Sequence, residues 1–344
     1  MNKIKFLILI LVLILSGCEK KNDEKNLSLY SYGDYVNQEI LDIYYKETGI
    51  KVNCDTFATS EDAYIKIKNG GINYDLIIAS DYIIERMIKE NLLQELDFSE
   101  IKNFDLIDDR FKNLDFDFEN KYSVPYAWGT VGILFNKKVI KKNNLSWNIL
   151  WDEKYKNKIF MYDNARDNIA ITLKKLGYSV NTCDDKKLEE AKKELIKQKK
   201  IIQAYLSDAI KDKMINDEAF LALCYSGDAL FCCKGNKNLD YVIPDEGSNF
   251  WIDGIGILKC SGKKKEASKF INFLCREDIG LLNTKYICHS TVNKKVLEAL
   301  PDEIKKNKIY WPSEKDFKRC EIYHDLGDVL KKYDVIWTEV LAED

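Results

Sequence analysis

Residues 74–79, YDLIIA, form a continuous strand-like run that is apolar except for Asp75, and a helical pattern follows at 82–90, YIIERMIKE. A short apolar run of this kind is typical of a strand that is buried on both faces of a parallel sheet. Toward the N-terminus, two more strands are predicted at 50–54 and at 27–32. A helix at 36–48, stopped by Gly49, and a second helix, capped by Thr59 to Asp62 and ending near Gly70, separate them. The β-α-β-α-β order predicts an α/β fold with a doubly wound sheet.

The pattern changes after Pro125, where further strands and a long polar helix predict a second α/β lobe. Strands are expected at 131–135, 159–162, 219–225, 241–243 and 255–258, and the helix at 186–199. No Pro-, Gly- or Ser-rich linker separates the lobes, so we expect a shared hinge that the chain crosses more than once. The expected division is 27–130 plus 253–298 for lobe I and 131–252 plus 299–344 for lobe II, with a ligand cleft between them.

The composition of the 344 residues excludes several classes of protein. With 46% hydrophobic and 32% charged residues, the chain is neither disordered, nor collagen-like, nor a polytopic membrane protein. The 53 basic residues against 56 acidic ones give no basic excess, so we expect no nucleic-acid partner.

The first eighteen residues predict an export signal. Lys3 and Lys5 precede an apolar run at 6–15, which is too short for a bilayer that needs about 20 residues. The ending LSGC at 15–18 resembles the bacterial lipoprotein cleavage box, in which Cys18 is lipidated and becomes the mature N-terminus. Residues 19–26 then form a charged tether. We expect a lipid-anchored protein in the periplasm or on the outer face of the cytoplasmic membrane; a plain signal peptide is the alternative.

Nine cysteines follow Cys18 and contain no CxxC pair, so they do not indicate a disulfide scaffold. We interpret most of them as buried small apolar side chains. Cys288-His289 and Cys320 with His324 offer zinc ligands, but their spacing matches no standard pattern. We expect no metal and no cofactor.

Carboxylates and aromatic side chains gather where the predicted strands end. They occur in the loops Tyr32-Gly33-Asp34-Tyr35, Ser80-Asp81-Tyr82, 163–167, 225–228 and 250–253. An anion receptor would place Gly, Ser, Thr and Arg there, whereas carboxylates with aromatic walls indicate a cation. A flexible chain with an ammonium at each end needs carboxylates at both ends of a cleft and rings between them. Taken singly, these tyrosines are equally compatible with core packing, and Asp34 and Asp81 with helix capping; we assign Asp81 to capping.

From Leu27 onward the sequence resembles the spermidine/putrescine-binding proteins of bacterial polyamine ABC transporters, in the type 2 periplasmic binding protein superfamily. The stretches that carry the resemblance occur in family order. They are LYSYGDYV at 29–36, YKETGIKV at 45–52, YDLIIAS at 74–80, KYSVPYAWGTVGILFN at 121–136, LKKLGYSVNT at 173–182 and FWIDGIGIL at 250–258. The resemblance implies a two-lobed, monomeric, non-enzymatic receptor that closes on a polyamine and docks on the transmembrane subunits of an ABC permease.

The resemblance also implies a set of ligand-binding residues. Asn164 replaces an acid of spermidine-preferring members, Asp228 matches a carboxylate of putrescine-preferring members, and Tyr323 falls near a pocket position. The implied ligand contacts are Tyr32, Asp34, Tyr35, Ser80, Tyr82, Asp167, Tyr225, Asp228, Trp251, Asp253 and His289. Strand alternation independently predicts that Trp251 and Asp253 share one side of a strand.

Several assignments stay open at this stage. Asp167 and Asp228 are alternatively ion-pair partners of Arg166 or of a lysine, and Arg166 itself is expected to be a structural ion-pair partner. Tyr122 and Trp128 are either hinge packing or ligand contacts. The alternative functions are a receptor of the same fold for another cationic or polar solute and an exported hydrolase acting through paired carboxylates.

Overall fold

The computed structural model describes residues 26–71, 73–141 and 145–343. The predicted signal peptide at 1–18, the lipidation site at Cys18 and nearly all of the tether lie outside the described residues. Within the described ranges, no helix is both long enough and apolar enough to cross a lipid bilayer.

The first three strands confirm the predicted β-α-β-α-β unit. β1 pairs in parallel with β2 on one side and with β3 on the other. α2 ends at Gly49, whose φ of 68° places it in the left-handed region that glycine tolerates. The Thr59 hydroxyl accepts from the Asp62 amide and caps α3, as predicted. The carboxyl ends of β1 and β3 therefore lie side by side, each followed by a loop or a helix N-terminus.

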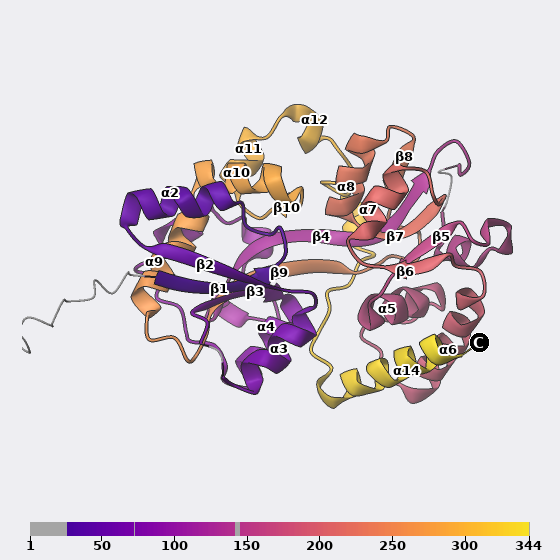
Figure 1. Cartoon of the computed structure of the whole chain (residues 1–344), viewed down its shortest axis with the longest axis horizontal. Coiled ribbons are helices and arrows are strands. Elements are labelled where there is room, and N and C mark those ends of the chain that lie inside the picture. Colours follow the sequence, from indigo (N-terminus) through magenta and orange to yellow (C-terminus); the bar gives the residue numbers. More distant parts are fainter. Residues whose placement is uncertain (1–25, 72, 142–144, 344) are drawn as a thin grey trace, which may run out of the picture.

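A long strand, β4, joins the two halves of the molecule (Figure 1). Its first half pairs antiparallel with β9, and its second half pairs antiparallel with β7 and β8. The strand order is β2-β1-β3-β9-β4-β7-β5-β6, with β8 and β10 also paired to β4. The sheet is therefore mixed, because β9 runs antiparallel to both β3 and β4, and β4 has the same direction as the parallel β1–β3 unit. Nearly every residue of β4 is buried, which explains why its sequence shows no alternation.

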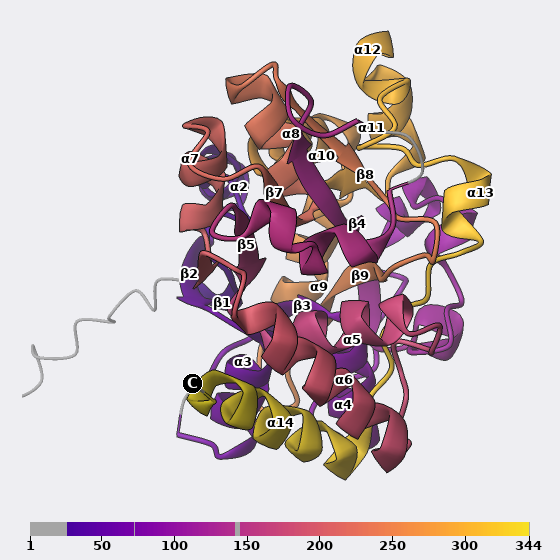
Figure 2. The ribbon, with the colours of Figure 1, turned by 90° about the vertical axis from the view of Figure 1, so that its right-hand side faces the viewer.

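Separate hydrophobic cores lie on the two sides of this junction. One core contains side chains of β1–β3, α2, α4, the start of β4 and the end of β9. The other contains side chains from the end of β4 together with β5, β7 and β8. A third cluster forms where α5, α6 and α14 pack together at the lower right of Figure 1 and across the front of Figure 2. The chain passes between the first two cores within β4, between Trp128 and Val131, and within β9, between Trp251 and Ile252.

Trp128 belongs to the core packing. Its indole Nε1 donates to the Thr291 carbonyl at 2.9 Å, and its rings contact Phe111, Phe250 and Trp311. Tyr122 hydrogen-bonds Glu95 on the surface at 3.4 Å. Of the two readings left open, packing is the one that the full burial of Trp128 supports.

The strands are β1 (Asn26–Tyr32), β2 (Lys51–Phe57), β3 (Leu76–Ser80), β4 (Ser123–Asn136), β5 (Ile159–Tyr162), β6 (Ala204–Leu206), β7 (Leu221–Tyr225), β8 (Leu239–Val242), β9 (Phe250–Ile257) and β10 (Ser290–Thr291). The α-helices are α2 (Gln38–Thr48), α3 (Ser60–Lys68), α4 (Asp81–Lys89), α5 (Ala165–Lys175), α6 (Asp185–Lys199), α7 (Ala209–Ile215), α8 (Ser226–Gly235), α9 (Lys264–Leu274), α10 (Glu277–Ile287), α11 (Lys294–Ala299), α12 (Asp302–Lys305), α13 (Glu314–Phe317) and α14 (Leu330–Ala342). Short 3-10 helices cover Lys102–Leu106, Asp109–Phe111, Phe118–Asn120, Trp147–Trp151, Glu153–Tyr155 and Gly327–Val329.

Candidate functional site

The carboxylate of Asp253 lies at the center of a buried hydroxyl network. Asp253 is on β9 opposite Ser80, the last residue of β3, and its side chain accepts a hydrogen bond from the Tyr35 hydroxyl. The Ser80 hydroxyl also shares a 2.6 Å hydrogen bond with the hydroxyl of Tyr32, which ends β1. β1, β3 and β9 are neighbors in the sheet, so their ends bring together these four residues, which are far apart in the sequence.

This carboxylate is held by neutral partners. The Asp253 side chain is 5% exposed, and burial raises its pKa to about 7, although the hydroxyls of Tyr35 and Ser80 oppose the shift. Among the described residues, no lysine or arginine forms an ion pair with it. Burying an ionized carboxylate without a cation costs free energy, and binding of a cation beside the carboxylate offsets that cost.

A second buried acid, Asp167, lies on α5. Its two oxygens accept hydrogen bonds from the hydroxyls of Tyr225 and Tyr323, the latter at 2.9 Å. The side chain is 3% exposed, and burial raises the pKa of Asp167. Asn164 caps α5 by accepting from the Asp167 amide at 2.9 Å, which fixes the direction of this turn. The second acid therefore repeats the arrangement of the first, with tyrosine hydroxyls in place of a cation.

Glu61 is a third acid beside this network; it is half-buried, and the sequence did not identify it. Its carboxylate accepts from the Tyr82 hydroxyl at 2.7 Å, and burial raises its pKa. The motif at 59–62 was fully explained by helix capping, so no signal singled out this side chain. Asp81, assigned to capping, is fully buried and accepts from the amides of Tyr82 and Ile252. Its bond to Ile252 ties α4 to β9, so Asp81 has a structural role in placing Asp253.

Arg166 does not form the ion pair that was expected of it. Its guanidinium lies over the rings of Tyr323, Tyr333 and Tyr82, at 4.5, 5.1 and 5.7 Å from their centroids. Its Nη2 donates to the Asn181 side chain at 2.8 Å, and its Nε and Nη1 have no hydrogen-bond partner among the described residues. The charge is close enough to lower the pKa of Asp167 in part, but burial has the larger effect and the net shift is upward.

A row of aromatic rings connects the two acids. The centroid distances along the row are 5.4 Å from Tyr35 to His289, 5.2 Å from His289 to Trp251, 6.3 Å from Trp251 to Tyr225 and 4.6 Å from Tyr225 to Tyr162. Trp251 Nε1 and His289 Nδ1 are buried, and neither has a hydrogen-bond partner in the part of the chain that the structure describes. Burial lowers the pKa of His289 to about 4, so the imidazole is neutral at pH 7. The rings therefore form an uncharged wall between Asp253 and Asp167.

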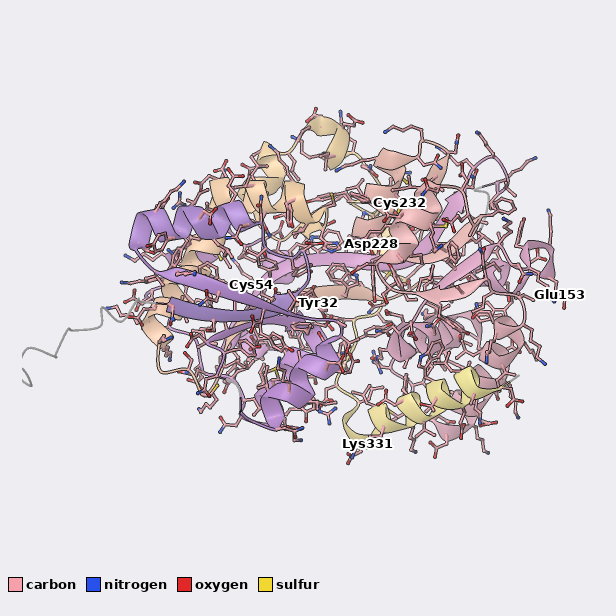
Figure 3. All side chains as sticks on the ribbon, in the orientation of Figure 1. Tyr32, Cys54, Glu153, Asp228, Cys232 and Lys331 are labelled. Atoms are coloured by element: carbon pink, nitrogen blue, oxygen red, sulfur yellow. The ribbon has the colours of Figure 1, made fainter. Side chains whose placement is uncertain are left out.

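Asp34 and Asp228 lie apart from the two buried acids. Asp34 has a φ of 52°, is exposed, and accepts from the Tyr286 hydroxyl at 3.2 Å. Asp228, on α8, accepts from the Tyr162 hydroxyl at 2.7 Å and forms an ion pair with Lys211 at 3.8 Å. Figure 3 shows Tyr32 at the end of β1 and Asp228 on α8, on opposite halves of the molecule. The structure thus gathers nine of the eleven predicted residues around the two buried acids and the rings between them. Asp228 adjoins Tyr162, the last ring of the row, and together with Asp34 is called the outer pair.

Two hollows lie away from these acids, and neither suits an organic cation. A cavity of about 40 Å³ between β4 and α10 is too small for a polyamine. A groove of about 470 Å³ beside β8 is bordered by Lys137, Lys237, Lys306 and Lys308, whose charges repel cations. Among the described residues, no group of three or more His, Cys, Asp or Glu side chains is placed to hold a metal ion.

The cysteines differ in part from the prediction. All nine are free. Only Cys224, Cys232 and Cys275 are buried, so the interpretation of most of them as core residues is wrong; Cys183 and Cys260 are exposed. Their sites lie on surface turns, where the absence of nearby apolar periodicity was the available signal.

The chain is similar to several known proteins. Residues 72–319 match the family model for bacterial extracellular solute-binding proteins. The chain is 34% identical over 325 residues to the spermidine/putrescine-binding periplasmic protein of Salmonella typhimurium, covering 93% of each chain. A structure of the spermidine/putrescine ABC transporter substrate-binding protein of Streptococcus pneumoniae superposes with a TM-score of 0.81 at 37% identity, covering 93% of this chain and 99% of that one.

A more distant structure supports the same fold. The Tp0655 lipoprotein of Treponema pallidum superposes with a TM-score of 0.83 at 24% identity, covering 92% of this chain and 99% of that one. The predicted mixed α/β fold of periplasmic binding proteins is therefore confirmed over nearly the whole chain.

Proposed function

Because this chain belongs to the bacterial extracellular solute-binding proteins, and within them to the spermidine/putrescine-binding group, we propose that it captures a polyamine outside the cytoplasm and delivers it to an ABC permease. It is a binding component of transport and carries out no chemical reaction of its own. The hydrolase alternative does not fit this membership.

The observation that carries the proposal is the pair of buried acids at the two ends of the ring row. Asp253 and Asp167 are each hydrogen-bonded by tyrosine hydroxyls, and burial raises the pKa of both. An ammonium group at each acid would supply the missing charge. The methylenes between two ammonium groups would then pack on Trp251 and Tyr225, whose faces attract cations by roughly 0.5–2 kcal/mol each.

We assign the two hydrophobic cores to two lobes that close on the ligand, with lobe I at 27–130 plus 253–298 and lobe II at 131–252 plus 299–344. Asp253 and Tyr35 belong to the first, and Asp167 and Tyr225 to the second. A ligand that contacts both acids binds the closed form better than the open form, and this difference in affinity drives closure. The closed form would then dock on the permease.

The N-terminal region supports an anchored location. We propose that Cys18 is lipidated and that residues 19–26 tether a monomeric receptor to the outer face of the cytoplasmic membrane. This proposal rests on the LSGC sequence at 15–18 and on the charged, apolar-free tether.

Isothermal titration calorimetry on the protein from residue 19 onward, refolded to remove any bound amine, tests the function. Putrescine and spermidine are the ligands, and 1,4-butanediol is the uncharged control of the same length as putrescine. We expect saturable binding of at least one amine and none of the diol. A folded protein that binds neither amine would refute polyamine binding, and equal binding of the diol would refute the role of the carboxylates.

A further inference from the structure

A lysine of α7, Lys211, lies at the outer end of the proposed site. Its Nζ is 3.8 Å from the carboxylate of Asp228 and 3.7 Å from that of Asp208, and its side chain is 28% exposed. Asp208 is 97% exposed and therefore contributes little to holding the lysine. The charge of Asp34, on the other half of the molecule, also acts on the Lys211 ammonium. Lys211 thus faces the outer pair of carboxylates.

Asp228 is built into the site in the same way as Asp167. Two stacked tyrosines, Tyr225 and Tyr162, lie 4.6 Å apart with an interplanar angle of 25°. The Tyr225 hydroxyl donates to Asp167, and the Tyr162 hydroxyl donates to Asp228 at 2.7 Å. Asp228 is therefore the next carboxylate along the ring row, and it is suited to receive a further ammonium group.

Lys211 already supplies an ammonium at this position. The separation of 3.8 Å is longer than a charge-assisted hydrogen bond of about 2.8 Å, so the two charges interact without a direct hydrogen bond. The lysine charge nevertheless repels any third ammonium that approaches Asp228. A diamine that ends at Asp253 and Asp167 avoids this repulsion, whereas a longer triamine does not.

We propose that Lys211 is a specificity-determining residue, whose ammonium occupies the outer carboxylate site at Asp228 and so favors a diamine over a triamine. The inference rests on the proposed function and deepens it, since it assigns the preference among polyamines to one side chain. The Lys211 ammonium competes with the third ammonium of spermidine for the carboxylate of Asp228.

The test compares Lys211→Met with the unaltered protein. Methionine keeps the length of the side chain and removes its charge. Lys211→Arg keeps the charge, and Lys213→Met is the matched control, because Lys213 lies two residues further along α7 and pairs with Glu218 at 2.7 Å. The measurement is the ratio of the spermidine and putrescine dissociation constants by calorimetry, with thermal unfolding as the check of folding.

We expect the unaltered protein to bind putrescine more tightly than spermidine. In Lys211→Met, the spermidine dissociation constant should fall at least tenfold while that of putrescine changes less than threefold; the other two variants should keep the original ratio. A ratio within twofold of the original in Lys211→Met would overturn the inference. Equal weakening of both amines would also overturn it, because it would make Lys211 a bridge between the lobes. Failure of the unaltered protein to bind either amine is a different result, and it would refute the proposed function itself.

Discussion

Replacing Asp253 by asparagine should weaken polyamine binding about 100-fold at pH 8. Asparagine has nearly the same shape and keeps one oxygen as an acceptor for the Tyr35 hydroxyl. The substitution therefore removes the charge and leaves the packing in place. At pH 8 the carboxyl group, whose pKa is raised by burial to about 7, is mostly ionized, so the full charge is lost.

The magnitude follows from the burial of the site. Two unit charges 4 Å apart attract by about 4 kcal/mol at an effective dielectric constant of about 20. The amide oxygen of asparagine keeps a hydrogen bond to the ammonium that is worth about 1 kcal/mol. The remaining loss of about 3 kcal/mol corresponds to roughly 100-fold in the dissociation constant.

The assay is calorimetry of both proteins with the amine that binds more tightly. Asp42→Asn on α2 is the control, because Asp42 is exposed and, within the described ranges, its side chain accepts a hydrogen bond from Gln38 alone, at 3.0 Å. Its dissociation constant should match that of the unaltered protein within twofold. A loss of less than tenfold in Asp253→Asn would show that no ammonium meets this carboxylate, and the account of the site would be wrong.

Three further predictions follow from the same contacts. Since an ammonium favors the ionized form of Asp253, polyamine affinity should rise with pH through about 7, by about tenfold between pH 6 and pH 8 from this group. Calorimetry in buffers of different protonation enthalpy should detect proton release on binding. An affinity independent of pH would contradict this prediction. In the ligand-free protein the ionized carboxyl has the opposite effect, since it lowers the free energy of unfolding. A carboxyl whose pKa rises from 3.8 to about 7 on folding destabilises the folded protein by about 4 kcal/mol at pH 8, and this destabilisation disappears as the pH falls toward 3.8. Asp253→Asn should therefore melt at a higher temperature than the unaltered protein at pH 8 and by a smaller margin at pH 5, and a lower melting temperature at pH 8 would refute this. Gly227→Ala places a methyl group into the His289 imidazole across the lobe boundary, so this variant should bind the amine at least tenfold more weakly without a lower melting temperature. Adding His289→Ala to Gly227→Ala should recover most of the lost affinity, and no recovery in the double variant would contradict this prediction.

The sequence predicts the site residues on strands better than the charged residues that surround them in turns and on helices. The β-α-β-α-β order places Ser80 and the Tyr32 loop at one edge of the sheet, and these are the positions that the structure brings together. Alternation along β9 also places Trp251 and Asp253 correctly, since both reach the same ring row. These successes follow from strand periodicity, which fixes the direction of a side chain once the strand is known.

The residues that the sequence misses or misplaces lie where periodicity does not act. Asp34 is in a turn with positive φ, which directs its side chain outward to Tyr286, and no pattern of apolar residues encodes that direction. Glu61 is hidden within a capping motif that explained it in full. Lys211 lies on the seven-residue helix α7 among other polar residues, and only the packing of α7 beside α8 brings its charge to Asp228.

A crystal structure of the protein with putrescine tests the central claim most directly. We predict one ammonium nitrogen about 3 Å from the carboxylate of Asp253, the other near Asp167, and the four methylenes against the indole of Trp251. Density for the amine elsewhere on the molecule, with Asp253 and Asp167 still bonded only to tyrosine and serine hydroxyls, would contradict it.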